Sequence, residues 1–272
     1  MKKINLMDIY KLTFSVSVAF AIMLIGCGGG GNSARQTLPG ENPTGPYVIT
    51  GTGTGTVTST GTNTYTNTDT NTGTGTITKT DTNTGTSTEA RTPAEMLIDG
   101  WGVMGDGNFG GSLSYFSYVL NLSNSSKDER QQAFNGRGWA RAKYYNIIEG
   151  LDDFKSSYQL SEINSNAYKE SILGYALALI QATGDSNIDR AIVLLADELK
   201  LSNPSFVLSY EHTCIGVTSP EAHAMLAYAY FWRGKNELAK AQIMQAKKDD
   251  SSSNGIVAQI YSTLELSGLF DN

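Results

Sequence analysis

The stretch Leu226–Ala246, LAYAYFWRGKNELAKAQIMQA, decides the fold of this chain. Its apolar residues recur at spacings of three and four, without the alternation typical of a strand, and a short break at Gly234 divides it. This periodicity indicates helices separated by a turn. The same pattern extends back to residue 92, so we expect the C-terminal two thirds of the chain to be helical throughout.

A pair made of a small residue and an aromatic residue recurs along this region. Its first copy is Gly100-Trp101 with Leu113 and Phe116, repeated 38 residues later as Gly138-Trp139, Leu151 and Phe154, and in weaker form as Gly174-Tyr175 and Ala227-Tyr228. Glycine inside a helix costs about 1 kcal/mol relative to alanine. Three glycines in one register therefore predict close approach of a partner helix.

The spacing within the last unit resembles the tetratricopeptide repeat, a helical hairpin of about 34 residues. Ala227 and Ala239 match the small positions where the two helices cross, and Gly234 matches the turn. The resemblance covers about residues 94–250 and implies an all-α solenoid of four hairpins, with a final helix over Gly255–Leu266 capping the last one. Successive units start 38, 36 and 53 residues apart, so we expect an irregular superhelix.

The helical domain is expected to run from Thr92 to Asn272. Thr92-Pro93-Ala94-Glu95 has the residues of a capping box, with proline in the first turn. Residues 202–219 interrupt the repeat between its third and fourth units. We expect the apolar side chains of this insertion to lie back on the domain, namely Phe206, Val207, Leu208 and Ile215.

The N-terminal segment, residues 1–26, has the pattern of a signal peptide. Lys2 and Lys3 precede an apolar run that is too short to span a membrane in the mature protein. The run ends at Leu24-Ile25-Gly26-Cys27, which resembles the lipobox of bacterial lipoproteins. The resemblance implies cleavage after Gly26 and attachment of acyl chains such as palmitate to Cys27. Gly28, rather than aspartate, resembles the pattern sorted to the outer membrane in a cell with two membranes.

Residues 27–91 are expected to form a disordered, low-complexity tether. From Thr50 to Thr88 every even-numbered residue is threonine, twenty in all, mostly alternating with glycine, asparagine and aspartate. These partners are poor strand formers and give no apolar face. A coil of about 65 residues averages roughly 45 Å end to end, which would hold the domain clear of the lipid. The hydroxyls either accept O-linked sugars or only solvate the tether.

Charge and cysteine content exclude two classes of protein. Without its first 26 residues the chain has 17 basic and 25 acidic residues, a net charge of −8, which argues against nucleic-acid binding. The only cysteines are Cys27 and Cys214, so a disulfide framework is excluded. If Cys27 is acylated, Cys214 is a lone thiol, more typical of a small buried residue than of a reactive one.

Three motifs that suggest chemistry have simpler interpretations. Gly105–Gly110 matches G-x-G-x-x-G, but it follows a helix rather than the strand that dinucleotide binding requires. The side chains of Glu211, His212, Cys214, Glu221 and His223 are of metal-binding types, but their spacing fits no closed site. The same two histidines lack a nucleophile motif beside them. We therefore expect no enzyme activity, no metal and no cofactor.

An aromatic ladder is the candidate partner-binding surface. In tetratricopeptide repeats the residue after the first small position tends to face the inner groove, and aromatic side chains are favoured binding anchors. Alternatively, these side chains pack between neighbouring first helices. The candidate residues are Trp101, Trp139, Lys143, Tyr175, Tyr228 and Trp232.

Taken together, these patterns predict a membrane-anchored, extracytoplasmic lipoprotein. Its helical domain would hold an unidentified protein or peptide in the groove, as an adaptor without catalysis. The alternative is a receptor for a small ligand or a cell-wall glycan that stacks on the aromatic ladder. A protein groove should be open along its length, whereas a ligand receptor should have a closed cavity roofed by the 202–219 insertion.

Overall fold

Three helices of the domain begin at a capping box. The Thr92 hydroxyl accepts a hydrogen bond from the Glu95 amide, and the Thr92 amide donates to the Glu95 carboxylate at 2.8 Å, as the capping-box prediction requires. Ser126 with Glu129 and Thr218 with Glu221 repeat this arrangement. Because each cap satisfies amides that have no partner within the helix, it stabilises its helix by about 1 kcal/mol.

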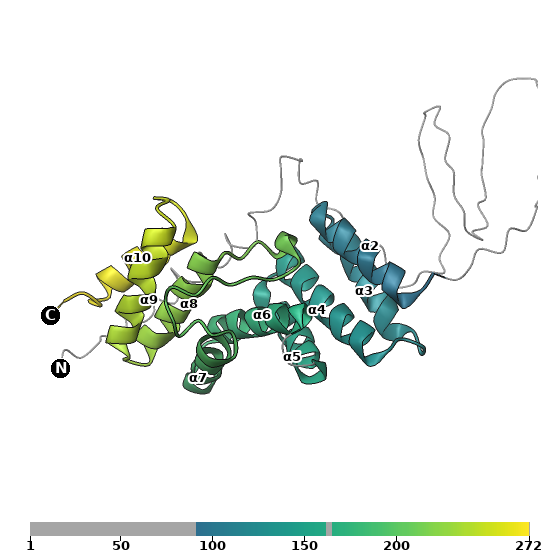
Figure 1. Cartoon of the computed structure of the whole chain (residues 1–272), viewed down its shortest axis with the longest axis horizontal. Helices are drawn as coiled ribbons and strands as arrows, with labels where there is room; N and C mark the ends of the chain where they lie inside the picture. The colour runs from purple at the N-terminus through teal and green to yellow at the C-terminus, as the bar shows by residue number, and fades with distance from the viewer. Residues whose placement is uncertain (1–90, 162–164, 272) are drawn as a thin grey trace, which may run out of the picture. The chain divides into compact units, whose positions relative to one another are not determined.

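The computed structural model describes residues 91–161 and 165–271. Within these ranges the chain is all-α and contains no strand, which confirms the all-α part of the predicted fold (Figure 1). The signal peptide, Cys27 and the threonine tract lie outside the described residues. The α-helices are α2 (Pro93–Gly105), α3 (Phe109–Asn121), α4 (Lys127–Tyr144), α5 (Leu151–Leu160), α6 (Asn166–Ala182), α7 (Asp185–Ile192), α8 (Ser219–Trp232), α9 (Asn236–Asp249) and α10 (Ile256–Leu266). Two short 3-10 helices, η1 (Ile147–Gly150) and η3 (Thr213–Ile215), and one π-helix, η2 (Val193–Glu198), complete the described structure.

Each helix packs mainly against its neighbour in the chain. Besides the four successive pairs α2 with α3, α4 with α5, α6 with α7, and α8 with α9, helix α3 packs as closely on α4, and α5 as closely on α6, and α10 covers both α8 and α9 (Figure 1). The first helices of successive pairs also contact one another, α2 with α4 and α4 with α6. None of the helices in the described part is long and apolar enough to cross a membrane.

Two phenylalanine rings explain why glycines recur in one register. A methyl group on Gly100 would lie 2.8 Å from the Phe116 ring, and one on Gly138 would lie 2.7 Å from the Phe154 ring. A methyl group on Gly174 would lie closer still to the same Phe154 ring. The predicted close approach is therefore confirmed, and its reason is a large ring of the neighbouring helix that needs the space of the missing side chain.

The first two pairs repeat this packing almost unchanged. The Trp101 and Phe116 ring centroids are 5.3 Å apart at 67°, and those of Trp139 and Phe154 are 5.1 Å apart, also at 67°. The third pair differs, since α7 runs directly into the π-helix η2, whose end is followed by Lys200 in the left-handed region at φ 64°.

Residues 202–218, here called the strap, leave η2 and return to α8. In Figure 1 this segment crosses α6 and reaches toward α2 before turning back. Leu208, Ile215 and Val217 are buried, as expected for Leu208 and Ile215. The expectation for Phe206 and Val207 is wrong, because both side chains are exposed, Val207 by 75%.

Backbone hydrogen bonds account for this exposure. The Phe206 carbonyl accepts from the His223 ring, and the Leu208 amide donates to the Ser219 hydroxyl. The polar backbone of this part of the strap is therefore satisfied by the domain, and the side chains of Phe206 and Val207 are left in solvent.

Candidate functional site

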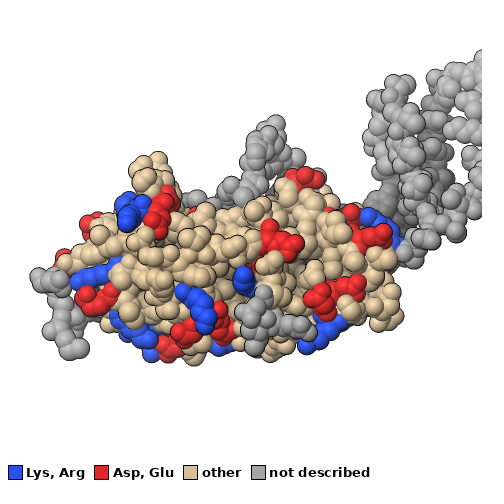
Figure 2. Space-filling view, in the orientation of Figure 1, with Lys and Arg blue, Asp and Glu red and all other residues tan. Residues whose placement is uncertain are grey.

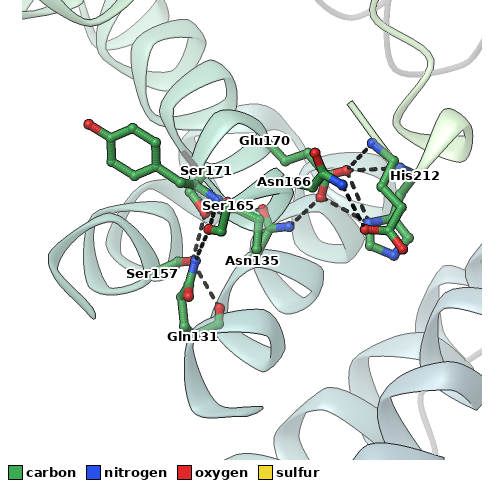
Figure 3. Close-up of polar contacts among 11 residues, drawn as sticks. Gln131, Asn135, Ser157, Ser165, Asn166, Glu170, Ser171 and His212 are labelled. Atoms are coloured by element: carbon green, nitrogen blue, oxygen red, sulfur yellow. Dashed lines mark hydrogen bonds and ion pairs between the residues drawn. The ribbon is translucent and has the colours of Figure 1, made fainter. Parts of the chain in front are cut away.

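A fully buried carboxylate lies where the strap meets the helices. Glu170, on α6, accepts hydrogen bonds from the backbone amides of Glu211 and His212 at 3.0 and 2.8 Å (Figure 3). The Asn135 side-chain amide, on α4, donates to its second oxygen at 2.7 Å. An unpaired buried charge is costly, so these donors are what allow the carboxylate to occupy this position.

The ring of His212 completes the contact between strap and helices. Its Nδ1 lies 2.9 and 3.0 Å from the two Glu170 oxygens and donates to them, since a carboxylate only accepts. Its face stacks on the Trp101 indole, with 3.6 Å between ring centroids and 7° between planes. Through its ring, His212 therefore joins the strap to one residue of α2 and one residue of α6.

A chain of polar side chains extends from Glu170 through the interior of the domain. Asn135 accepts from the Ser171 hydroxyl, which lies 2.6 Å from the Ser157 hydroxyl, and Gln131 donates to Ser161 at 2.8 Å (Figure 3). These residues come from α4, from α6 and from α5 or its C-terminal end. Their hydrogen bonds therefore fix the relative positions of the helices that surround Glu170.

The base of the strap is held by a second, separate set of contacts. His223 is buried, with Nε2 2.7 Å from the Phe206 carbonyl and Nδ1 2.6 Å from the Gln242 side-chain oxygen. Gln242 donates in turn to the carbonyl of Leu201 at 2.7 Å. The Tyr210 hydroxyl donates to the Val217 carbonyl and so joins the two arms of the strap.

Two buried indole groups lack an acceptor. Within the described part of the chain, Nε1 of Trp101 and Nε1 of Trp139 have no hydrogen-bond partner. Trp101 is 8% exposed and Trp139 is fully buried. A buried donor without an acceptor costs about 1–3 kcal/mol. For Trp101, this cost arises at the same indole ring on which His212 of the strap stacks.

The six candidate aromatic-ladder residues do not lie on one open surface. Trp101, Trp139, Lys143 and Tyr228 are buried, and only Tyr175 and Trp232 are partly exposed. Tyr175 lies beside Tyr158 of α5, and Trp232 donates to Asp185 of α7 at 3.3 Å. Of the six, Trp101 alone contacts the strap through an observed side-chain stack.

A second polar cluster, away from the strap, joins α5, α6 and η2. The hydroxyls of Tyr158 and Tyr168 donate to Glu198 at 3.2 and 2.8 Å, and Arg190 pairs with the same carboxylate at 3.3 Å. Burial and then the Glu198 carboxylate raise the pKa of Tyr168 above its usual value. These side chains satisfy one another's hydrogen-bonding groups. They join the second helix pair, α4 with α5, to the third, α6 with α7.

The residues that suggested metal binding or catalysis have other partners. His212 contacts Glu170, His223 contacts Gln242, and Glu221 caps α8. Among the described residues, no three His, Cys, Asp or Glu side chains are grouped to hold a metal ion. The Gly105–Gly110 motif joins α2 to α3 and is not preceded by a strand.

Sequence reasoning named Trp101 and His212 separately but missed Glu170 and Asn135. A signal was present: Glu170 is a charged residue at helical spacing with Ala167, Leu173 and Leu177, which are apolar. An acidic side chain on the apolar face of a helix requires a buried donor. The sequence does not show that the donor comes from residues 211 and 212.

Comparisons with known proteins return no relative. No family model, no curated protein and no solved structure matches this chain.

Proposed function

We propose that this chain is a membrane-tethered adaptor that binds a protein or peptide on the face of α2, α4 and α6 where the strap lies. The observation that carries the proposal is the pair of consecutive backbone amides, of Glu211 and His212, that donate to buried Glu170. A side chain that binds backbone amides recognises a polypeptide irrespective of its sequence, while the Trp101 stack selects a ring.

The helix pairs support a tetratricopeptide-like organisation of this domain. Glycine and phenylalanine alternate between neighbouring helices, so that Phe116 and Phe154 each fill the space left by glycines. Repeated hairpins bury their core only against one another, and this leaves an extended surface for partners. The proposal assigns no catalytic step, metal or cofactor to the domain.

A glycan or small-ligand receptor has less support. Such a ligand would stack on an aromatic face, but the His212 ring already covers the Trp101 indole at 3.6 Å. The acidic balance of the chain likewise favours a protein partner over nucleic acid. On the face drawn in Figure 2, basic and acidic side chains are interspersed rather than gathered into a basic stretch.

Photo-crosslinking in cells tests the adaptor proposal. A photo-reactive residue replaces Val207, which is 75% exposed on the strap, and a matched control replaces Leu266, which is 89% exposed on α10. We expect a discrete protein adduct from position 207 that is missing from position 266. Equal adducts at both positions, or none at position 207, would contradict the proposal.

The anchor is tested separately. The lipobox resemblance proposes acylation of Cys27, with the outer membrane as destination in a cell with two membranes. Cys27→Ser should abolish incorporation of labelled palmitate and move the protein from the membrane fraction to the soluble fraction, whereas Cys214→Ser should change neither. Retention of the Cys27→Ser protein in membranes would refute the anchor.

A further inference from the structure

The tip of the strap is held in the manner of a bound peptide. Its contacts with the helices are two backbone amides on one carboxylate, and one ring between Trp101 and Glu170. Asn166 adds a hydrogen bond to the exposed Glu211 side chain at 3.2 Å. The buried apolar residues nearest the tip, Leu208 and Ile215, lie on either side of residues 211 and 212 rather than at them.

Among the described residues, the indole on which the strap tip stacks has an unpaired N–H. Trp101 is more than nine-tenths buried beneath His212, yet its indole N–H has no acceptor in the described part of the chain. Buried donors are almost always paired in a completed site. The fully buried indole of Trp139, which the strap does not contact through a ring stack, has the same unpaired N–H within the described ranges, so this feature recurs in the packing of the repeated tryptophans.

Two residues with left-handed backbone lie before the strap and after its tip. Lys200 precedes it in the left-handed region at φ 64°, a strained conformation for a residue with a side chain, and Gly216 ends its tip at φ 74°. Phe206 and Val207 leave its first arm exposed. The base contacts of His223 and Gln242 do not involve the tip, so the tip can leave while the base stays attached.

We infer that the strap tip occupies, in the free protein, the site of a histidine-bearing peptide segment of the partner. The partner segment displaces the tip, donates two consecutive amides to Glu170, and places its imidazole between Glu170 and Trp101. Histidine fits because the site requires both a flat ring at stacking distance and an N–H directed at a carboxylate, as His212 provides. Phenylalanine lacks an N–H that could bind Glu170, and lysine lacks a planar ring that could stack on Trp101.

This inference rests on the proposed function, since it names the ligand class and the regulation of the same face. The strap then acts as an internal competitor, and the apparent affinity for the partner is the intrinsic affinity multiplied by the fraction of molecules in which the tip is released.

Peptide binding to the full chain in detergent tests the inference. The probe is a fluorescent synthetic peptide with the sequence of residues 205–217, carrying serine in place of its cysteine. The tip-released variant, Glu211→Pro with His212→Ala, loses one amide donor and the ring. Its matched control, Glu211→Ala, keeps every backbone donor and the His212 ring, and loses only the exposed carboxylate.

We expect the peptide to bind the tip-released variant at least about tenfold more tightly than it binds the unaltered chain or the control. Replacing the histidine of the peptide by alanine should remove about tenfold of that affinity, as should Glu170→Gln in the tip-released background. Equal affinity for all forms, or binding that is independent of Glu170, would overturn the inference.

A measurement on the unaltered protein covers the case in which the tip-released variant does not fold. Saturating peptide should increase hydrogen exchange at the amides of residues 211 and 212, because the tip is displaced, while exchange in α9 stays the same. Unchanged exchange at these amides would also overturn the inference. If crosslinks from position 207 persist while the peptide fails both tests, the adaptor proposal stands and only the peptide site is wrong.

Discussion

The imidazole of His212 lies parallel to the indole of Trp101, although 111 positions separate them in the sequence. The stack joins the first helix of the domain to the segment before α8. The same indole also packs against the Phe116 ring at a T-shaped angle of 67°. Trp101 is therefore shared between the core of the first helix pair and the binding site of the strap.

This double role predicts unequal effects for the two partners of the stack. Trp101→Ala should lower the free energy of unfolding by about 3–5 kcal/mol, because it also opens a cavity beside Phe116. His212→Ala should cost about 1–2 kcal/mol, since Glu170 keeps its amide donors. Tyr118→Ala, at a half-exposed position of α3, serves as the control and should change stability by less than about 0.5 kcal/mol. Denaturant titration measures all three, and a Trp101→Ala loss no larger than that of Tyr118→Ala would contradict the packing.

Replacing glycine by alanine should change the stability of the domain in opposite directions at two positions, one in α4 and one in α2. Gly138→Ala places a methyl group 2.7 Å from the Phe154 ring and should destabilise the domain by about 1–3 kcal/mol. Gly102→Ala, with nothing within 4 Å of the added carbon, should stabilise α2 by up to about 1 kcal/mol. Thermal unfolding followed by circular dichroism separates the two, and a change of the same sign in both would refute the role of Phe154.

A buried ion pair and an exposed one provide a second matched comparison. Asp153 accepts two hydrogen bonds from Arg137, at 2.7 and 3.0 Å, and lies 3.0 Å from Arg141. Asp153→Ala leaves Arg137 without its partner and should cost about 3 kcal/mol. Glu237→Ala removes an ion pair with Lys240 in which the carboxylate is 88% exposed, and should cost less than about 0.5 kcal/mol. Comparable losses in urea titrations would show that burial does not matter here.

Alkaline pH should destabilise the domain through a buried tyrosine. Burial raises the pKa of the Tyr228 hydroxyl, because the phenolate would lose its hydration. The folded state therefore keeps a proton that the unfolded state releases above pH of about 10, so the stability present below that pH is lost as the pH rises. In unfolding experiments from pH 9 to 11, Tyr228→Phe should flatten the decline by up to about 1.4 kcal/mol per pH unit. A slope identical to that of the unaltered chain, and to that of the exposed-site control Tyr118→Phe, would reject this origin.

Features that depend on neighbours in the sequence were predictable. The capping box at Thr92 and the glycine register at Gly100 and Gly138 follow from backbone hydrogen bonding and from side-chain volume, which act over a few residues or between adjacent helices. The all-α class follows from the periodicity for the same reason. The strap was harder to predict, because Val207 is apolar yet exposed, and only the backbone contacts to His223 and Ser219 decide its orientation.

The candidate site was only half predictable. Trp101 and His212 stood out by residue type, but their stack depends on how far the strap reaches, and no local rule gives that distance. The rest of the aromatic ladder was chosen by register alone. Trp139 and Tyr228 share that register and are fully buried, since the neighbouring helices enclose them more completely than the repeat pattern implies.

The buried carboxylate of Glu170 sets an order for the assembly of the chain during synthesis. Helices α2 to α6 are synthesised before residues 211 and 212, so the backbone amides that compensate Glu170 are made after the helix that carries it. Until then the carboxylate needs water, and α4 and α6 cannot close over it without a large desolvation cost. The N-terminal helix pairs therefore complete their packing only after the later part of the chain has been made, and a truncated product that ends before Glu211 should keep its interior hydrated.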